Sequence, residues 1–300
     1  MSAAGVDCVL EAGAQVGEGA TWCALTQRLL WVDAWAKSVH RLDPVSGVDE
    51  HWTLPQRVGC VAPCTDGRLL LGLEDGFWLL DPASGAAAPV AALAHAGDNR
   101  CNDSVVDPAG RMWCGSMNMK GVNGPLTGEL FDFDGRSAPR RHFGDIGIAN
   151  GLACAPNGRS LYLSDSHPSV NRIWRFALDP ESGELGNRTL FLDGAELPGR
   201  PDGATVDSDG CYWICAMDGW SVLRITPQGK IDRRIVLPVS KPSKLAIGGA
   251  RLDTLFITSI SATLDAAGRA AQAQAGHLFA VHVGPLGIAS PTVSMADLAL

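Results

Sequence analysis

The sequence predicts an all-β protein, a six-bladed β-propeller, from the spacing of its turn residues and from a repeat along the chain. Glycine (35 residues) and proline (18 residues) interrupt the chain throughout, and few segments have the apolar spacing of a helix. Short runs rich in Val, Leu, Trp and Phe lie between these turn residues, which is the pattern of short strands.

The repeat consists of a turn followed by an apolar strand, then a second strand that usually ends in a turn. The first strand occurs at residues 27–33, 66–72, 109–115, 157–163, 209–214 and 251–257. The second occurs at residues 38–44, 76–82, 128–135, 171–180, 221–227 and 276–281. Units of about 40–50 residues with this content match four-stranded propeller blades, which close into a ring to bury their faces. We therefore predict a single domain over residues 1–300.

One segment departs from the repeat. Residues 261–275 are rich in alanine and lie between two strands of the last unit. We predict a long loop or a short helix there, either a lid or an inert surface insertion.

Composition narrows the possible partners and the compartment. A formal net charge of −8 and a pI near 5.3 argue against nucleic-acid binding. The first residues do not resemble a signal peptide, and no apolar run is long enough to span a membrane. The nine cysteines form no Cys-x-x-Cys pair, which favours free thiols and a cytoplasmic protein. We expect a monomer or a small homo-oligomer, with no nucleic-acid or membrane partner.

Four polar residues occupy the same position in different units, eight residues before the turn glycine or at the corresponding place in the first unit. They are Glu18, Asn102, Asn150 and Asp202. The second unit has Gly59 at this position. Because equivalent positions of successive blades surround the propeller axis at one depth, these side chains are expected to face one another.

Such a ring predicts a metal site. Two carboxylates with amide oxygens suit Ca²⁺, Mg²⁺ or Mn²⁺, with Zn²⁺ or Fe²⁺ as further possibilities. Glycines beside Glu18, Asn150 and Asp202 are expected to leave room for the ion and a substrate. The alternative interpretation is that these residues only form Asx-turns where the strands begin. Arg100, Lys241 and Lys244 are further candidates near the ring, the alternative being solvated charges at its rim.

Four separated motifs resemble the SMP-30/gluconolactonase/luciferin-regenerating family. They are Gly17-Glu18-Gly19, Arg100-Cys101-Asn102-Asp103, Ala149-Asn150-Gly151-Leu152 and Pro201-Asp202-Gly203. The resemblance implies a six-bladed propeller, one divalent cation held by Glu18, Asn150 and Asp202, substrate contacts from Arg100 and Asn102, and hydrolysis of sugar lactones. Lys120 falls where the animal members resembled carry a substrate-contacting glutamate, so it is a further predicted substrate-binding residue, the alternative being a solvated lysine in a loop. Ser104 replaces a glycine found in many members.

The expected reaction is hydrolysis of an aldono-1,4- or 1,5-lactone, such as L-arabinono-, D-xylono-, D-galactono- or D-gluconolactone, to the aldonic acid in a sugar oxidation pathway. Asp202 is the predicted catalytic residue, either as general base or as a group that only orients a hydroxide generated by the ion. The chain contains no Gly-x-Ser-x-Gly nucleophile elbow. The alternative function is a non-catalytic, metal-binding propeller that serves as a protein-interaction module.

Overall fold

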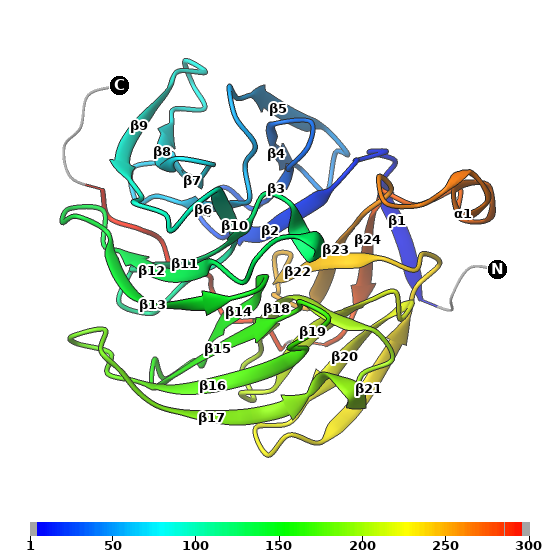
Figure 1. Cartoon of the computed structure of the whole chain (residues 1–300). Helices are drawn as coiled ribbons and strands as arrows, with labels where there is room; N and C mark the ends of the chain where they lie inside the picture. Colours follow the sequence, from blue (N-terminus) through cyan, green and yellow to red (C-terminus); the bar gives the residue numbers. More distant parts are fainter. Residues whose placement is uncertain (1–4, 285, 296–300) are drawn as a thin grey trace.

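The computed structural model describes residues 5–284 and 286–295, and it contains six four-stranded antiparallel sheets. Figure 1 shows the sheets arranged around a common centre, which confirms the predicted six-bladed propeller. Each blade except the last is built from consecutive strands, so each predicted repeat corresponds to one sheet.

The first three blades follow the chain from residue 17 to residue 146. Blade 1 contains β2 (Gly17–Cys23), β3 (Arg28–Asp33), β4 (Ser38–Leu42) and β5 (Asp49–Thr53). Blade 2 contains β6 (Cys60–Pro63), β7 (Leu69–Gly72), β8 (Gly76–Leu80) and β9 (Ala87–Ala92). Blade 3 contains β10 (Asn99–Val106), β11 (Met112–Asn118), β12 (Gly128–Phe133) and β13 (Arg140–Ile146).

The remaining three blades complete the ring. Blade 4 contains β14 (Ala149–Cys154), β15 (Ser160–Asp165), β16 (Arg172–Leu178) and β17 (Leu185–Asp193). Blade 5 contains β18 (Arg200–Val206), β19 (Tyr212–Met217), β20 (Ser221–Ile225) and β21 (Ile231–Val236). Blade 6 contains β22 (Pro242–Gly248), β23 (Thr254–Ser259), β24 (Leu278–His282) and, as its outer strand, β1 (Val6–Leu10).

The last blade joins the two ends of the chain. Strand β1 pairs antiparallel with β24, with Val6 opposite Val281 and Cys8 opposite Phe279. The sequence repeat did not reveal this strand, because β1 is detached from its unit and has no turn motif of its own. The closure holds the N-terminal segment and the last blade in one sheet, so the ring is fastened by backbone hydrogen bonds.

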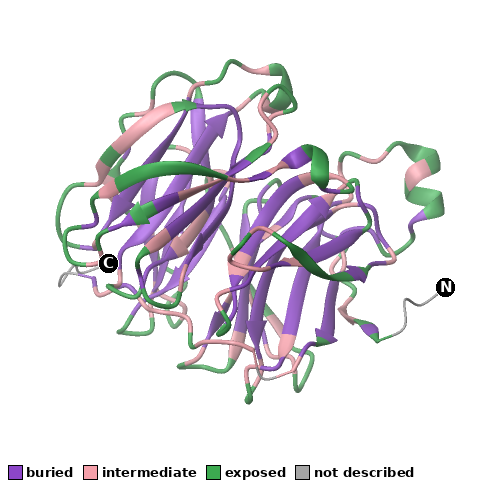
Figure 2. Ribbon diagram, turned by 90° about the horizontal axis from the view of Figure 1, so that it is seen from below, coloured by how far each residue is buried: buried purple, intermediate pink, exposed green. Residues whose placement is uncertain are grey.

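Burial falls from the axis to the rim. The first strands of neighbouring blades contact one another around the whole ring, and β14 and β22 are buried at every residue. The outer strand β21, with Asp232, Arg233 and Arg234, is largely exposed. Figure 2 shows buried strands inside the blades and exposed ribbon mainly in loops and at the outside. The charged outer strands protect the free sheet edges from pairing with other chains.

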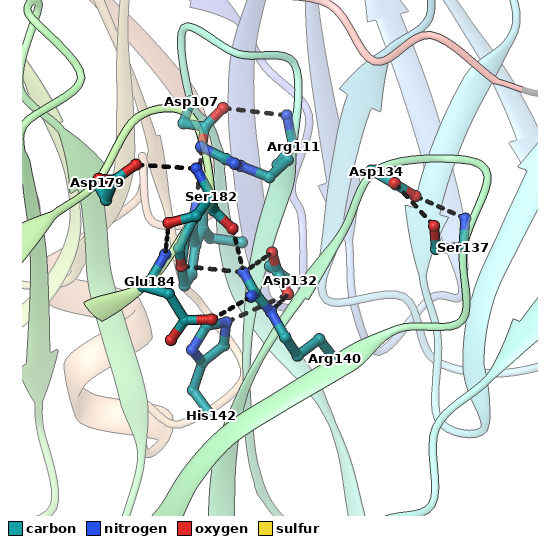
Figure 3. Close-up of polar contacts among 12 residues, drawn as sticks. Asp107, Arg111, Asp132, Asp134, Ser137, Arg140, His142, Asp179, Ser182 and Glu184 are labelled. Atoms are coloured by element: carbon teal, nitrogen blue, oxygen red, sulfur yellow. Dashed lines mark hydrogen bonds and ion pairs between the residues drawn. The ribbon is translucent and has the colours of Figure 1, made fainter.

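Arginines on one blade fasten it to the next. Figure 3 shows this between blades 3 and 4, where Arg111 and Arg140 reach the turn at residues 179–184. The Arg111 Nη2 atom donates to the Pro180 carbonyl at 2.7 Å, and the Arg140 Nη1 atom lies 2.7 Å from Glu184 Oε1. Arg140 also forms an ion pair of 3.0 Å with Asp132 of its own blade.

Two further segments lie on opposite faces. The irregular segment of the last unit contains a short helix, α1 (Ala266–Ala271), as predicted. After β24, residues 286–293 cross the face opposite to α1, where Ser208 N donates to the Leu286 carbonyl at 2.7 Å and Val293 N to the Pro63 carbonyl at 3.0 Å. Among the described residues no helix is long and apolar enough to cross a membrane. All nine cysteines are free thiols, as predicted.

Candidate active site

The inner strands carry the same backbone irregularity near their beginning. In β18, Pro201 pairs with Ala216 and Ala204 pairs with Ile214, so Asp202 and Gly203 lie together opposite one residue. The same shift lies between Glu18 and Thr21, Cys101 and Ser104, Asn150 and Ala153, and Pro242 and Leu245. A β-bulge of this kind turns a side chain away from the usual strand alternation. Five blades therefore have a bulge near the start of the inner strand: Asn102 and Asp202 lie within it, and Glu18 and Asn150 directly precede it.

The structure brings the two predicted amides together. Asn102 on β10 donates through Nδ2 to Asn150 Oδ1 at 2.9 Å and to the Ala149 carbonyl at 2.9 Å. The Asn150 Nδ2 atom in turn donates to Ser166 Oγ at 2.9 Å. Ser166 therefore fixes the orientation of the Asn150 amide, and both Asn102 and Asn150 keep an oxygen that can accept a further partner.

The two predicted carboxylates begin the inner strands of blades 1 and 5. Burial, together with the nearby carboxylates of Asp202 and Asp103, raises the pKa of Glu18 well above its usual range. Burial also raises the pKa of Asp202 to about 7, against the opposing effect of Arg200. Asp202 is 3% exposed, and no hydrogen-bond donor from the described residues reaches its carboxylate. Glu18 and Asp202 therefore belong to a group of neighbouring carboxylates that also includes Asp103.

A buried ion pair lies beside these carboxylates. The Lys244 Nζ atom donates to Asp103 Oδ1 at 2.6 Å and to the Ser104 carbonyl at 3.3 Å, while Asp103 Oδ2 accepts from Leu152 N at 2.8 Å. Lys244 is 4% exposed and Asp103 is 3% exposed. The interpretation of Lys244 as a solvated rim charge is therefore wrong. We did not predict the role of Asp103, because strand alternation places it on the face opposite to Asn102 and the bulge brings both to the axis.

The charges of this group fit a divalent cation. Lys244 neutralises Asp103, which leaves the two carboxylates of Glu18 and Asp202 beside the amide oxygens of Asn102 and Asn150. Two negative charges with oxygen donors are the chemistry that Ca²⁺, Mg²⁺ or Mn²⁺ requires. Among the described residues, no group of three or more His, Cys, Asp or Glu side chains is arranged to hold a metal ion. The predicted set contains only two such side chains and depends on amide oxygens for the rest.

The expectation that glycines leave room for an ion is wrong at two positions. A Cβ atom on Gly203 would lie 2.3 Å from Lys244 Cδ, and one on Gly151 would lie 2.4 Å from the Tyr212 hydroxyl. Both glycines instead allow neighbouring blades to approach closely, and Gly151 also needs its φ of +59°. The space next to Gly203 and Gly151 is filled by protein atoms.

The predicted substrate-binding cations lie in different environments. Arg100 is 8% exposed, and its Nη1 atom donates to the Cys101 carbonyl at 2.8 Å. Lys241 forms an ion pair with Asp218 at the same face. Lys120 is exposed in the loop between β11 and β12, and its side chain makes no polar contact within the described ranges. The structure thus brings Arg100 and Asn102 to the ring and leaves Lys120 at its margin.

An apolar cavity continues along the axis beyond the ring. Its walls come from all six inner strands, with Ile288 and Pro291 of the C-terminal segment at the far end. Most of its lining is Ala, Val, Leu and Ile, and Lys244 is its only charged side chain among the described residues. A sugar needs several hydrogen-bond partners, so the polar mouth on the other side of the ring is the better candidate for substrate binding.

Known proteins share this architecture and sequence. Residues 16–261 match the family described as "SMP-30/Gluconolactonase/LRE-like region". The chain is 36% identical over 287 residues to a 6-deoxy-6-sulfogluconolactonase of Pseudomonas putida, covering 95% of this chain and 97% of that protein. It is 30% identical over 254 residues to a pentonolactonase of Haloferax volcanii, with 84% of each covered. The structure of a calcium-binding protein, regucalcin, from Agrobacterium tumefaciens superposes with a TM-score of 0.91 at 27% identity, covering 97% of this chain and 98% of that one.

These matches establish the class of protein. A six-bladed propeller with sequence similarity over nearly its whole length to lactone-hydrolysing proteins is itself a lactone hydrolase. The chain belongs to the SMP-30/gluconolactonase/LRE-like family, as its four motifs predicted.

Proposed function

We propose that the protein hydrolyses a sugar lactone to the corresponding aldonic acid with the help of one divalent cation. The observation that carries this proposal is the pair of carboxylates, Glu18 and Asp202, beside two amide oxygens. Among the described residues no donor reaches Asp202, and only the backbone N–H of Gly19, at 3.3 Å, donates to Glu18. The names of the similar proteins support a lactone substrate, and both hexono- and pentonolactones are represented among them.

Glu18, Asn150 and Asp202 would hold the cation, with Asn102 beside them. A bound divalent cation supplies Lewis acidity at the carbonyl oxygen of the lactone. Asp202 accepts the proton of the attacking water and returns it to the ring oxygen as the ester bond breaks. The product is the open-chain hydroxy acid, so one water is consumed for each lactone.

Arg100 and Asn102 orient the substrate. The Arg100 guanidinium is held by the Cys101 carbonyl and by Met117 Sδ, which lies 3.1 Å from Nη2. The amide of Asn102 is fixed through its bonds to the Ala149 carbonyl and to Asn150. Side chains held in this way lose little further conformational freedom when they bind sugar hydroxyls.

A panel of pentono- and hexonolactones, assayed by acid release with and without chelator, tests the proposal. We expect hydrolysis of at least one lactone, loss of activity after chelation, and recovery on adding Ca²⁺, Mg²⁺, Mn²⁺ or Zn²⁺. Full activity after exhaustive removal of metal would contradict the role of the cation, and no hydrolysis of any lactone would contradict the reaction.

A further inference from the structure

A second ring of side chains lies two residues ahead of the polar ring in the sequence. In four blades the residue at this position is a cation, and in blades 1 and 4 it is apolar. The residues, from blade 1 to blade 6, are Val16, Arg57, Arg100, Ile148, Arg200 and Lys241. Residues i and i+2 of a strand face the same side, about 7 Å apart along it. Arg100 and Arg200 lie in β10 and β18, and Arg57 and Lys241 lie just before β6 and β22, so all four cations are at the side where the inner strands begin.

Arg57 and Arg100 form one side of this cationic ring. The segment before β6 packs closely against β10. A Cβ atom added to Gly59 would lie only 2.3 Å from the Cys101 carbonyl oxygen. The Arg57 guanidinium lies 5.9 Å from the centre of the Trp35 ring, and its Nε atom is 3.9 Å from Glu74 Oε1. Burial and the nearby charge of Arg57 lower the pKa of Arg100, although Glu18 opposes this.

Arg100 has no neutralising partner at contact distance. Its guanidinium donates to a backbone carbonyl and to a thioether sulfur, and no carboxylate of the described residues lies within 4.0 Å. A buried cation without a close carboxylate is costly in free energy, and a ligand anion can offset that cost through charge-assisted hydrogen bonds. The planar guanidinium also suits bidentate recognition of carboxylate, sulfonate or phosphate oxygens.

Arg200 and Lys241 form the other side and share a single carboxylate. Lys241 pairs with Asp218, while the Arg200 Nη2 atom lies 3.9 Å from the same side chain. The Arg200 Nη1 atom donates to the Ser166 carbonyl at 3.1 Å, which holds the arginine against blade 4. Within the described ranges only Glu74 and Asp218 form ion pairs with the four cations, so the cations of this ring outnumber the carboxylates that pair with them.

We propose that this cationic ring is a subsite for an anionic group on the substrate, with Arg57 and Arg200 as residues that determine specificity. The substrate class would be a sugar lactone with a carboxylate, sulfonate or phosphate at the end remote from the lactone carbonyl. The subsite rests on the proposed function, because the polar ring would hold the carbonyl end while the cationic ring holds the charged end. The formal net charge of the chain is −8, so the gathering of four cations is a local feature of this site.

The test compares two substrates that differ only in the remote charge, 6-phospho-D-glucono-1,5-lactone and D-glucono-1,5-lactone. For the wild-type enzyme with its cation, we expect kcat/KM to be at least about tenfold higher for the phosphorylated lactone, and the advantage to shrink as salt is added. In the Arg57→Gln/Arg200→Gln double variant, the ratio of the two kcat/KM values should fall to about one. Arg159→Gln, which removes an exposed arginine from a turn at the opposite ends of the strands, should keep the wild-type ratio.

A wild-type enzyme without preference for the phosphorylated lactone, or a double variant that keeps the wild-type ratio, would overturn the subsite. Measuring the binding of the open-chain acids distinguishes failure of the subsite from failure of the proposed lactonase reaction, because binding does not require hydrolysis. Calorimetry should show tighter binding of 6-phospho-D-gluconate than of D-gluconate to the wild type, and equal binding of both to the double variant. If neither lactone is hydrolysed, the reaction is wrong, and equal binding of the two acids to the wild type would refute the subsite as well.

Discussion

Asp202 and Asp207 are two buried aspartates of the same stretch of blade 5, and their surroundings differ completely. Asp207, directly after β18, accepts hydrogen bonds from Asp209 N (3.0 Å), Cys211 N (2.9 Å), Trp213 Nε1 (2.8 Å) and Arg224 Nε (2.7 Å). Asp202, in the bulge of β18, has no donor among the described residues, and its pKa is raised to about 7 by burial, against the opposing effect of Arg200. One carboxylate is fully satisfied by the fold, and the other is left for a partner outside the chain.

The same contrast recurs in blade 3. Asp107, at the turn end of β10, accepts from Ala109 N, Arg111 and Trp113 Nε1. Near the other end of the same strand, the Asn102 side chain forms its hydrogen bonds to the neighbouring blade 4. The turn ends of the inner strands thus hold the blades together, while the opposite ends provide polar groups for chemistry.

The largest effect is expected at Asp202. Asp202→Asn removes a negative charge from the proposed metal site and its proposed general base, so kcat/KM for a hydrolysed lactone should fall by about 10³-fold or more, about 4 kcal/mol. The fold should be kept, because no hydrogen bond of the described residues depends on this carboxylate. Asp179→Asn, in an exposed turn (Figure 3), is the matched control and should stay near the wild-type rate.

Asp207→Asn should show the opposite behaviour. It leaves the Arg224 side chain without its closest buried partner, and the free energy of unfolding should fall by about 3–5 kcal/mol in chemical denaturation. The molecules that remain folded should hydrolyse lactone at the wild-type kcat. A large loss of kcat with unchanged stability would place Asp207 in the active site and remove the contrast with Asp202.

The Lys244–Asp103 pair should behave as a coupled structural unit beside the proposed metal site. Lys244→Met leaves the buried Asp103 carboxylate with only the backbone N–H groups of Leu152 and Ser104 as donors among the described residues, and should lower the free energy of unfolding by about 3 kcal/mol. The Lys244→Met/Asp103→Asn double variant should recover most of this loss. Additive losses in the double-mutant cycle would show that the two side chains do not depend on each other.

A smaller effect is expected in the pH dependence of stability without metal. The folded pKa of Asp202, about 7, lies above its usual value of 3.8, so ionisation disfavours the folded state. The chelated protein should therefore lose stability as the pH rises from about 4 to about 7, with no further loss from this group above that range. Melting temperatures of chelated wild type and Asp202→Asn between pH 5 and 8 check this. If the melting temperature changed with pH by the same amount in both proteins, the raised pKa of Asp202 would be contradicted.

The repeat made most of the fold predictable. Turn glycines and apolar strands located six units, and the in-phase positions Glu18, Asn102, Asn150 and Asp202 located the ring. Strand β1 was not predictable from the repeat, since its partner β24 lies more than 260 residues away in the chain. Pairing across such a distance leaves no local pattern.

The side-chain contacts within the site also could not be predicted from the sequence. Strand alternation assigns neighbouring residues to opposite faces, whereas the bulge brings both Asn102 and Asp103 to the axis. The burial of Lys244 and the atoms that fill the space beside Gly203 depend on how the blades pack against one another. The sequence pattern does not describe that packing. The type of each residue could be predicted, and its partner across the axis could not.

The most direct test of the contrast between a satisfied and an unsatisfied aspartate is a calorimetric titration of Ca²⁺ into chelator-treated protein, with lactone hydrolysis followed in the same samples. The wild type should bind one ion per chain and regain activity in proportion to the bound ion, whereas Asp202→Asn should do neither and Asp179→Asn should match the wild type. Tight binding and full activity in Asp202→Asn would contradict the account, since the unpaired carboxylate would then serve neither the ion nor the reaction.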